Sequence, residues 1–145
     1  MAFKLVTPSA RCRTVFMPKK ASTALAEGEA LYTASGVVTS LSASSDERIA
    51  GICQKPVAST DSDYASTTKI PVLIDEDGIW EADPSSTTNT ITNGTALDFN
   101  NSTTVHVSNS TYDQFICYNP AGTANLTKLR GVLTRWESSE PAATN

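Results

Sequence analysis

The chain has 145 residues, a formal net charge of −4 and only 18% charged side chains. This length allows one domain with a core that needs no metal or disulfide. The mildly acidic balance argues against a nucleic-acid partner, since such binders present a basic surface. No apolar run is long enough for a membrane span and no signal peptide is visible, so we expect synthesis in a cytoplasm and no membrane partner.

The N-terminal segment is basic and extended in character. Residues 3–6 form either a short strand or part of an arm, and residues 11–17 alternate loosely before Pro18 breaks the run. The segment contains no acidic residue, and its basic residues are Lys4, Arg11, Arg13, Lys19 and Lys20. We expect residues 1–22 to be an extended basic N-terminal arm that is poorly ordered in the isolated protein.

Three strands are predicted next along the chain. Turn signals at Gly28 and Gly36 frame strands at residues 30–33 and 37–41. A third strand covers residues 48–54 and contains a glycine, Gly51, which indicates a bulge or a close approach of another backbone.

The strongest turn signal is Asp-Glu-Asp-Gly at residues 75–78, between apolar runs at residues 69–74 and 79–82. This pattern predicts a β-hairpin. Alternation in the returning strand places Trp80 on the face opposite Glu81. Because a tryptophan buries a large area, Trp80 is expected to be a core or interface anchor.

Further short strands are predicted up to residue 136, which gives eight to ten in all. They cover residues 96–99, 103–107, 113–118 and 126–136. This spacing predicts an all-β fold, with a single compact β-sandwich or β-barrel-like domain of short antiparallel strands. We expect the β-domain at residues 23–137 and a flexible C-terminal tail at residues 138–145.

Side chains with catalytic or metal-binding chemistry are scattered. Cys12, Cys53 and Cys117 have no metal-ligand spacing, and their apolar surroundings predict three small buried side chains in a reducing compartment. The only histidine, His106, is expected in mid-strand, where nothing supports a general base. The acidic turn at residues 75–78 lacks the alternating oxygen ligands of a calcium loop. We predict no enzymatic activity, no metal and no cofactor.

The charges are unevenly distributed along the chain. Residues 1–22 contain basic side chains and no acid, whereas residues 75–83 contain five acids and no base. These charges either lie on solvated loops or allow the basic arm of one copy to meet an acidic neighbour.

An ordered series of motifs over residues 24–135 resembles the small head-decoration (cement) proteins of tailed bacteriophages. The motifs are Ala-Glu-Gly-Glu-Ala-Leu-Tyr at 26–32, Gly-Val-Val at 36–38, Ile-Ala-Gly-Ile at 49–52, Ile-Pro-Val-Leu-Ile-Asp at 70–75, Gly-Ile-Trp-Glu-Ala at 78–82, Asn-Ser-Thr-Thr-Val-His-Val at 101–107 and Leu-Arg-Gly-Val at 129–132. Each motif alone recurs in many β-proteins, and the resemblance is in their order.

The resemblance implies a virion structural protein, made in the host cytoplasm, that binds the outer surface of a capsid and bridges major capsid protein subunits. It also implies a homo-oligomer, with a trimer favoured. The expected capsid contacts are Lys4, Arg11, Arg13, Lys19, Lys20 and Trp80. The alternatives are another phage virion β-protein, from the tail, neck or fibre, and a carbohydrate-binding module that uses Trp80.

Overall fold

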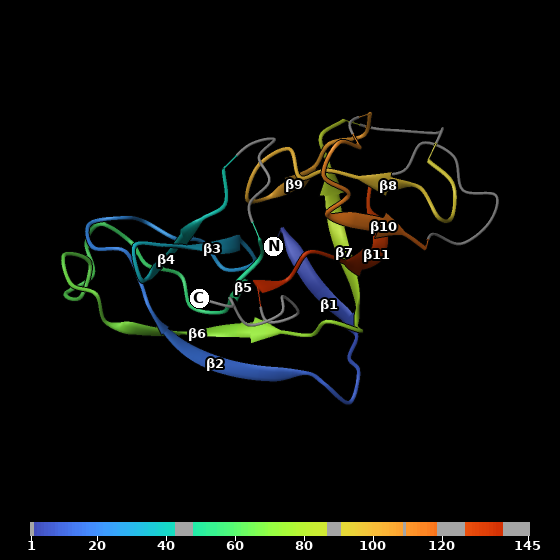
Figure 1. The fold of residues 1–145 in the computed structure, drawn as a ribbon. Helices are drawn as coiled ribbons and strands as arrows, with labels where there is room; N and C mark the ends of the chain where they lie inside the picture. The colour runs from blue at the N-terminus through green and yellow to red at the C-terminus, as the bar shows by residue number, and fades with distance from the viewer. Residues whose placement is uncertain (1, 43–47, 87–90, 109, 119–126, 138–145) are drawn as a thin grey trace, which may run out of the picture.

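The computed structural model describes residues 2–42, 48–86, 91–108, 110–118 and 127–137. In these ranges the chain forms eleven strands in two packed sheets, which confirms the all-β prediction (Figure 1). The strands are β1 (Phe3–Thr7), β2 (Arg13–Pro18), β3 (Ala30–Ala34), β4 (Val37–Ser40), β5 (Gly51–Cys53), β6 (Lys69–Ile74), β7 (Ile79–Pro84), β8 (Ala96–Leu97), β9 (Thr104–Val105), β10 (Phe115–Cys117) and β11 (Leu129–Leu133). The tail expected at residues 138–145 lies outside the described ranges.

The first sheet has the strand order β1-β7-β11-β10-β8, and β9 pairs with β7. The β7–β9 pair is parallel and the other pairs are antiparallel. Alternation along β7 is as predicted, with Trp80 and Ala82 buried and Ile79 and Glu81 partly exposed. Its inner face therefore supplies large apolar side chains to the core between the sheets.

The second sheet has the order β2-β6-β5-β3-β4 and curls until its two ends meet. Lys19, just after β2, forms a bridge with Val38 of β4, and the backbone N–H of Lys20 donates to the Val38 carbonyl at 2.9 Å. The sheet is thus closed at one end into a small barrel, and its buried interior contains Leu25, Leu31, Val38, Ala50, Cys53, Val57, Ile70 and Val72.

The segment after β11 ties the two sheets together. The N–H of Ile49 donates to the Arg135 carbonyl at 2.9 Å, and the N–H of Glu137 donates to the Ile49 carbonyl at 2.8 Å. Between these bonds lies Trp136, whose ring centroid is 6.1 Å from that of Trp80. The inter-sheet core is therefore built around two tryptophans from different parts of the chain.

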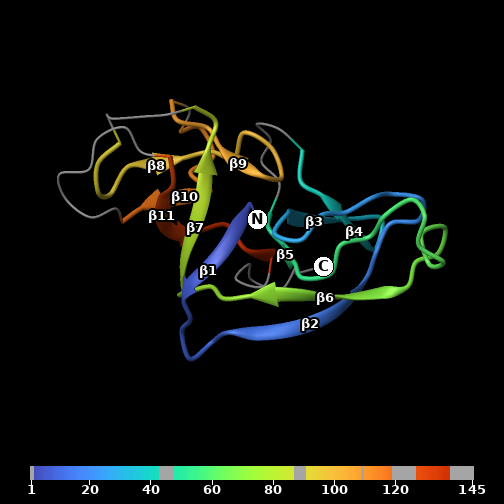
Figure 2. The same ribbon diagram turned by 180° about the vertical axis from the view of Figure 1, so that it is seen from behind.

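The prediction of a β-hairpin at residues 75–78 is wrong. Strand β6 pairs with β2 and β5 in the second sheet, whereas β7 pairs with β1 and β11 in the first sheet. Residues 75–78 are therefore a corner at which the chain changes sheet (Figure 2). The local turn signal is the same for a corner and a hairpin, and only the pairing partners distinguish them.

The chain changes sheet in the same way between β1 and β2. Phe3 lies opposite Ala82 in the β1–β7 pair, and Pro18 lies opposite Lys69 at the far end of the β2–β6 pair. The segments 3–18 and 69–84 consequently form one long two-stranded ribbon, bent at the point where both cross from the first sheet to the second.

The expectation of a separate N-terminal arm is also wrong. Residues 3–7 and 13–18 are extended, but they are strands of the two sheets, and Phe3 is only 1% exposed. The Phe3 ring lies 4.9 Å from that of Phe99, centroid to centroid. The high density of positive charge suggested an arm, but residues 3–7 and 13–18 alternate as strands do. Inward-facing apolar side chains are buried or partly buried, whereas Lys4 and Arg13 are exposed.

Two strand glycines lie where another chain segment approaches closely. A Cβ atom at Gly51 would lie 2.2 Å from Val72 Cγ1, and one at Gly131 would lie 2.1 Å from the Ile116 carbonyl oxygen. The same Cβ atom at Gly51 would lie 3.0 Å from the Leu73 carbonyl oxygen, so of the two alternatives predicted there, a bulge or a close backbone approach, the close approach is confirmed.

We expect Phe3→Ala to lower the free energy of unfolding by about 3–5 kcal/mol, because it removes a buried ring from the inter-sheet core. The matched control is Lys4→Ala, one residue along the same strand, where an exposed side chain should change stability by less than about 0.5 kcal/mol. Urea denaturation measures both, and equal stability of the two variants would mean that β1 is not part of the domain.

Candidate partner-binding surface

A buried carboxylate lies at the bend of the ribbon. Asp75 is fully buried and accepts hydrogen bonds from the Ser9 backbone N–H at 2.7 Å and from the Ser9 hydroxyl. The Asp77 N–H donates to it at 3.3 Å, and the Asp75 carbonyl accepts from the Trp80 indole at 3.2 Å. These donors offset the cost of burying the carboxylate and join the two legs of the ribbon.

The opposite charges noted in the sequence meet within one chain at this corner. Arg11 lies 2.7 Å from Glu76 and 3.4 Å from Asp77, and Arg13 lies 3.1 Å from Glu76. The Glu76 side chain is only 6% exposed, so this ion pair is less screened by solvent than the Arg11–Asp77 pair. The acidic turn at residues 75–78 therefore forms ion pairs with the basic N-terminal segment of the same chain.

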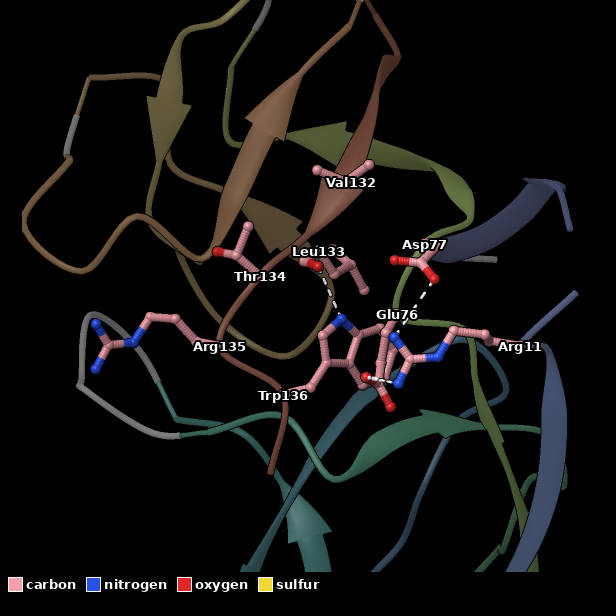
Figure 3. Close-up of a pocket in the computed structure, with 8 residues that line it drawn as sticks. All are labelled: Arg11, Glu76, Asp77, Val132, Leu133, Thr134, Arg135 and Trp136. Carbon is pink, nitrogen blue, oxygen red and sulfur yellow. Dashed lines mark hydrogen bonds and ion pairs between the residues drawn. The ribbon is translucent and has the colours of Figure 1, made fainter. Parts of the chain in front are cut away.

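Beside this corner lies an open depression of about 450 Å³ (Figure 3). Its walls are formed by Arg11, Glu76 and Asp77 on one side and by residues 132–136 on the other. The Trp136 indole N–H at its base donates to the Leu133 carbonyl at 2.7 Å. Since Arg11 is paired with Glu76 and Asp77 and the Trp136 indole N–H is bonded to the Leu133 carbonyl, we assign no ligand to the depression. In the part of the chain that the structure describes, no cluster of His, Cys, Asp and Glu side chains is arranged to hold a metal.

The six expected capsid-contact residues fall into two groups. Lys4, Arg11, Arg13 and Lys20 are exposed. Lys19 and Trp80 are fully buried, so naming them as contact residues is wrong.

Each of the two buried side chains has a structural role instead. The Lys19 ammonium donates to the Tyr64 carbonyl at 3.1 Å and to the Ser66 carbonyl at 2.6 Å, which satisfies the charge inside the domain. Trp80 packs on Trp136 in the inter-sheet core, so it is not the exposed platform that a carbohydrate-binding module requires.

The structure shows a further exposed surface, on β2, that was not predicted from the sequence. Phe16 in the middle of β2 is 62% exposed, and it lies opposite Pro71 of β6. Lys20 and Lys69 are exposed near the C-terminal end of β2, and neither forms an ion pair within the described ranges. We call Thr14, Phe16, Lys20, Lys69 and Pro71 the β2 surface.

The sequence does not distinguish this surface, because Val15, Phe16 and Met17 are consecutive apolar residues. Val15 and Met17 are partly buried while Thr14 and Phe16 are exposed, so the alternation of β2 turns an aromatic side chain outward. Phe16 is one of two large hydrophobic side chains exposed in the described ranges, and the other is Tyr118 at 52%. The β2 surface therefore combines an apolar centre with unpaired positive charge.

The cysteines only partly follow the prediction of three buried side chains. Cys53 and Cys117 are buried, and desolvation raises the pKa of each thiol to about 11. Cys12 is exposed beside the corner, so its predicted burial is wrong. Its pKa is also raised, first by desolvation and then by the charge of Asp75.

No match to this chain is found among protein-family models, curated proteins or solved structures. No helix within the described ranges has the length and hydropathy to cross a membrane.

We expect Asp75→Ala to destabilise the fold by about 1–3 kcal/mol, because it leaves the half-buried Ser9 donors and the Asp77 N–H without their acceptor. Asp77→Ala removes only an exposed ion pair at the same corner and should cost less than about 1 kcal/mol. Urea unfolding of the two variants tests this difference, and equal costs would show that the buried carboxylate does not brace the corner.

We expect one thiol per chain to react rapidly with a disulfide reagent at pH 8 under native conditions, and all three to react in guanidinium. Cys12 is accessible, whereas Cys53 and Cys117 are covered and almost wholly protonated at that pH, well below their pKa of about 11. Cys12→Ser should abolish the rapid phase. A rapid phase that persists in this variant would contradict the assignment.

Proposed function

We propose that this protein is a structural component of a phage virion that decorates the outer surface of the capsid and bridges major capsid protein subunits. The proposal starts from the ordered motifs that resemble head-decoration proteins. Those motifs coincide with seven of the eleven strands, drawn from both sheets: β3, β4, β5, β6, β7, β9 and β11. The resemblance thus involves the framework of the domain and is not limited to one loop.

The observation that carries the proposal is the exposure of Phe16 on a braced ribbon. Covering a large aromatic side chain is favourable because it removes apolar area from water. The strand that carries it is held by β6 on one side and by the Asp75 corner at its start. Little conformational freedom is therefore lost when a partner covers Phe16, which favours binding.

A small contact such as the β2 surface is sufficient when the partner is repeated many times, as subunits are in a capsid shell. One exposed aromatic side chain and a few lysines give a modest contact, but many copies on a shell, or several contacts per oligomer, raise the overall affinity. We propose a homo-oligomer on the capsid, with a trimer favoured because decoration of this kind bridges neighbouring subunits around symmetry axes.

The test is binding of the purified protein to expanded capsids that lack a decoration protein, followed by co-sedimentation and by calorimetry of capsid melting. We expect saturable binding and a rise in the capsid melting temperature, because a ligand of the assembled state stabilises that state. Absence of both would overturn the proposal. Electron microscopy that locates the protein on the tail would favour the tail, neck or fibre alternative.

Phe16→Ser should weaken capsid binding by at least about tenfold, as expected for an anchoring aromatic residue. Tyr118→Ser is the matched control, since it removes the other exposed aromatic side chain from the end of β10 in the first sheet. Equal losses in the two variants would count against the β2 surface as the contact.

A further inference from the structure

The backbone of β2 has one edge that faces away from β6. The Gln54 N–H donates to the Pro71 carbonyl at 3.1 Å, so this carbonyl points toward β5 and away from β2. Phe16 lies directly opposite Pro71. In an antiparallel pair, such a residue is in a non-hydrogen-bonded position, and its own N–H and C=O point to the outer edge.

The residues that follow β2 agree with this assignment. The Lys19 N–H donates to the Thr68 carbonyl at 3.2 Å, on the side of β6, whereas the Lys20 N–H donates to the Val38 carbonyl at 2.9 Å, on the side of β4. Even-numbered residues of this segment therefore direct their backbone groups outward. The bridge to Val38 occupies that edge at the C-terminal end of β2.

Farther from the barrel closure, the outer edge is open. Among the residues that the structure describes, the outward N–H and C=O groups of Thr14 and Phe16 have no hydrogen-bond partner. Both residues are exposed. An unpaired strand edge beside an exposed aromatic side chain is a template on which another strand can pair.

We propose that this edge of β2 accepts an extended acidic segment of the capsid protein as an additional strand of the second sheet. The identity of the partner rests on the proposed function, whereas the mode of binding rests on the direction of the β2 backbone. Thr14 and Phe16 would exchange backbone hydrogen bonds with the added strand, and an apolar residue of that strand would cover the Phe16 ring.

The charge around the edge selects an acidic segment. Exposed Arg13 lies at one end of β2, and Lys20 and Lys69 lie at the other end. Arg13 is paired with Glu76, and Arg11 is paired with both Glu76 and Asp77. Within the described ranges, the positive charge that has no ion pair at this edge therefore comes from Lys20 and Lys69. Pairing β2 with β2 of a second copy would bring these cations together, and like charges on adjacent strands are destabilising.

The decisive variant is Thr14→Pro, compared with Thr14→Val. Proline removes the outward N–H, and a proline is tolerated in an edge strand when its N–H side faces solvent. Valine keeps that N–H and the β-branched shape. We expect Thr14→Pro to weaken capsid binding by at least about tenfold and Thr14→Val to bind like the wild type, with similar melting temperatures for both variants. Equal binding by the two would overturn the inference while wild-type binding still supports the proposed function.

A second measurement uses no capsid and no variant. Amide hydrogen exchange of the wild-type protein is followed with a short peptide that alternates glutamate and valine, and with a matched peptide of lysine and valine. We expect the acidic peptide alone to slow exchange at Thr14 and Phe16, and added salt to reverse the effect. Unchanged exchange with the acidic peptide would overturn the inference, whatever the result with capsids.

Discussion

The architecture of this protein depends on the buried carboxylate of Asp75. A charge removed from water must be met by donors, and here they come from Ser9, 66 residues away in the sequence, and from the backbone of the same turn. Because one carboxylate bonds to both legs of the ribbon, the two chain segments bend together from the first sheet into the second. The relative position of the sheets, and of the tryptophan core between them, follows from that shared corner.

The same constraint shapes the surface that a partner meets. The corner fixes the start of β2, and the contact of Lys19 and Lys20 with Val38 fixes the region beyond its end. Between these two points β2 is held along one edge only, by β6. The strand is therefore rigid in position and open along its other edge, with Phe16 at its centre, and such preorganisation lowers the entropic cost of binding.

The charge pattern shows how an intramolecular contact can resemble an interface. A basic segment and an acidic segment far apart in sequence attract each other whether they belong to one chain or to two, because Coulomb energy depends on distance and dielectric. Arg11, Arg13 and Glu76 lie within one chain because the ribbon brings residues 11–13 beside the turn. The exposed cations left over for a partner are fewer than the composition implies. Among them, Lys20 and Lys69 lie near the C-terminal end of β2, and Lys4 lies in β1.

The sequence alone was sufficient to place most of the strands, the alternation that buries Trp80 and Ala82, and the close approach at Gly51. These features depend on neighbours a few residues apart, and a period of two is visible in any short window. Only the tertiary structure decided that residues 75–78 are a corner, that Lys19 is buried and that Phe16 is exposed. Those outcomes depend on which distant strands pair, and pairing is decided by packing over the whole chain, for which a local pattern carries no information.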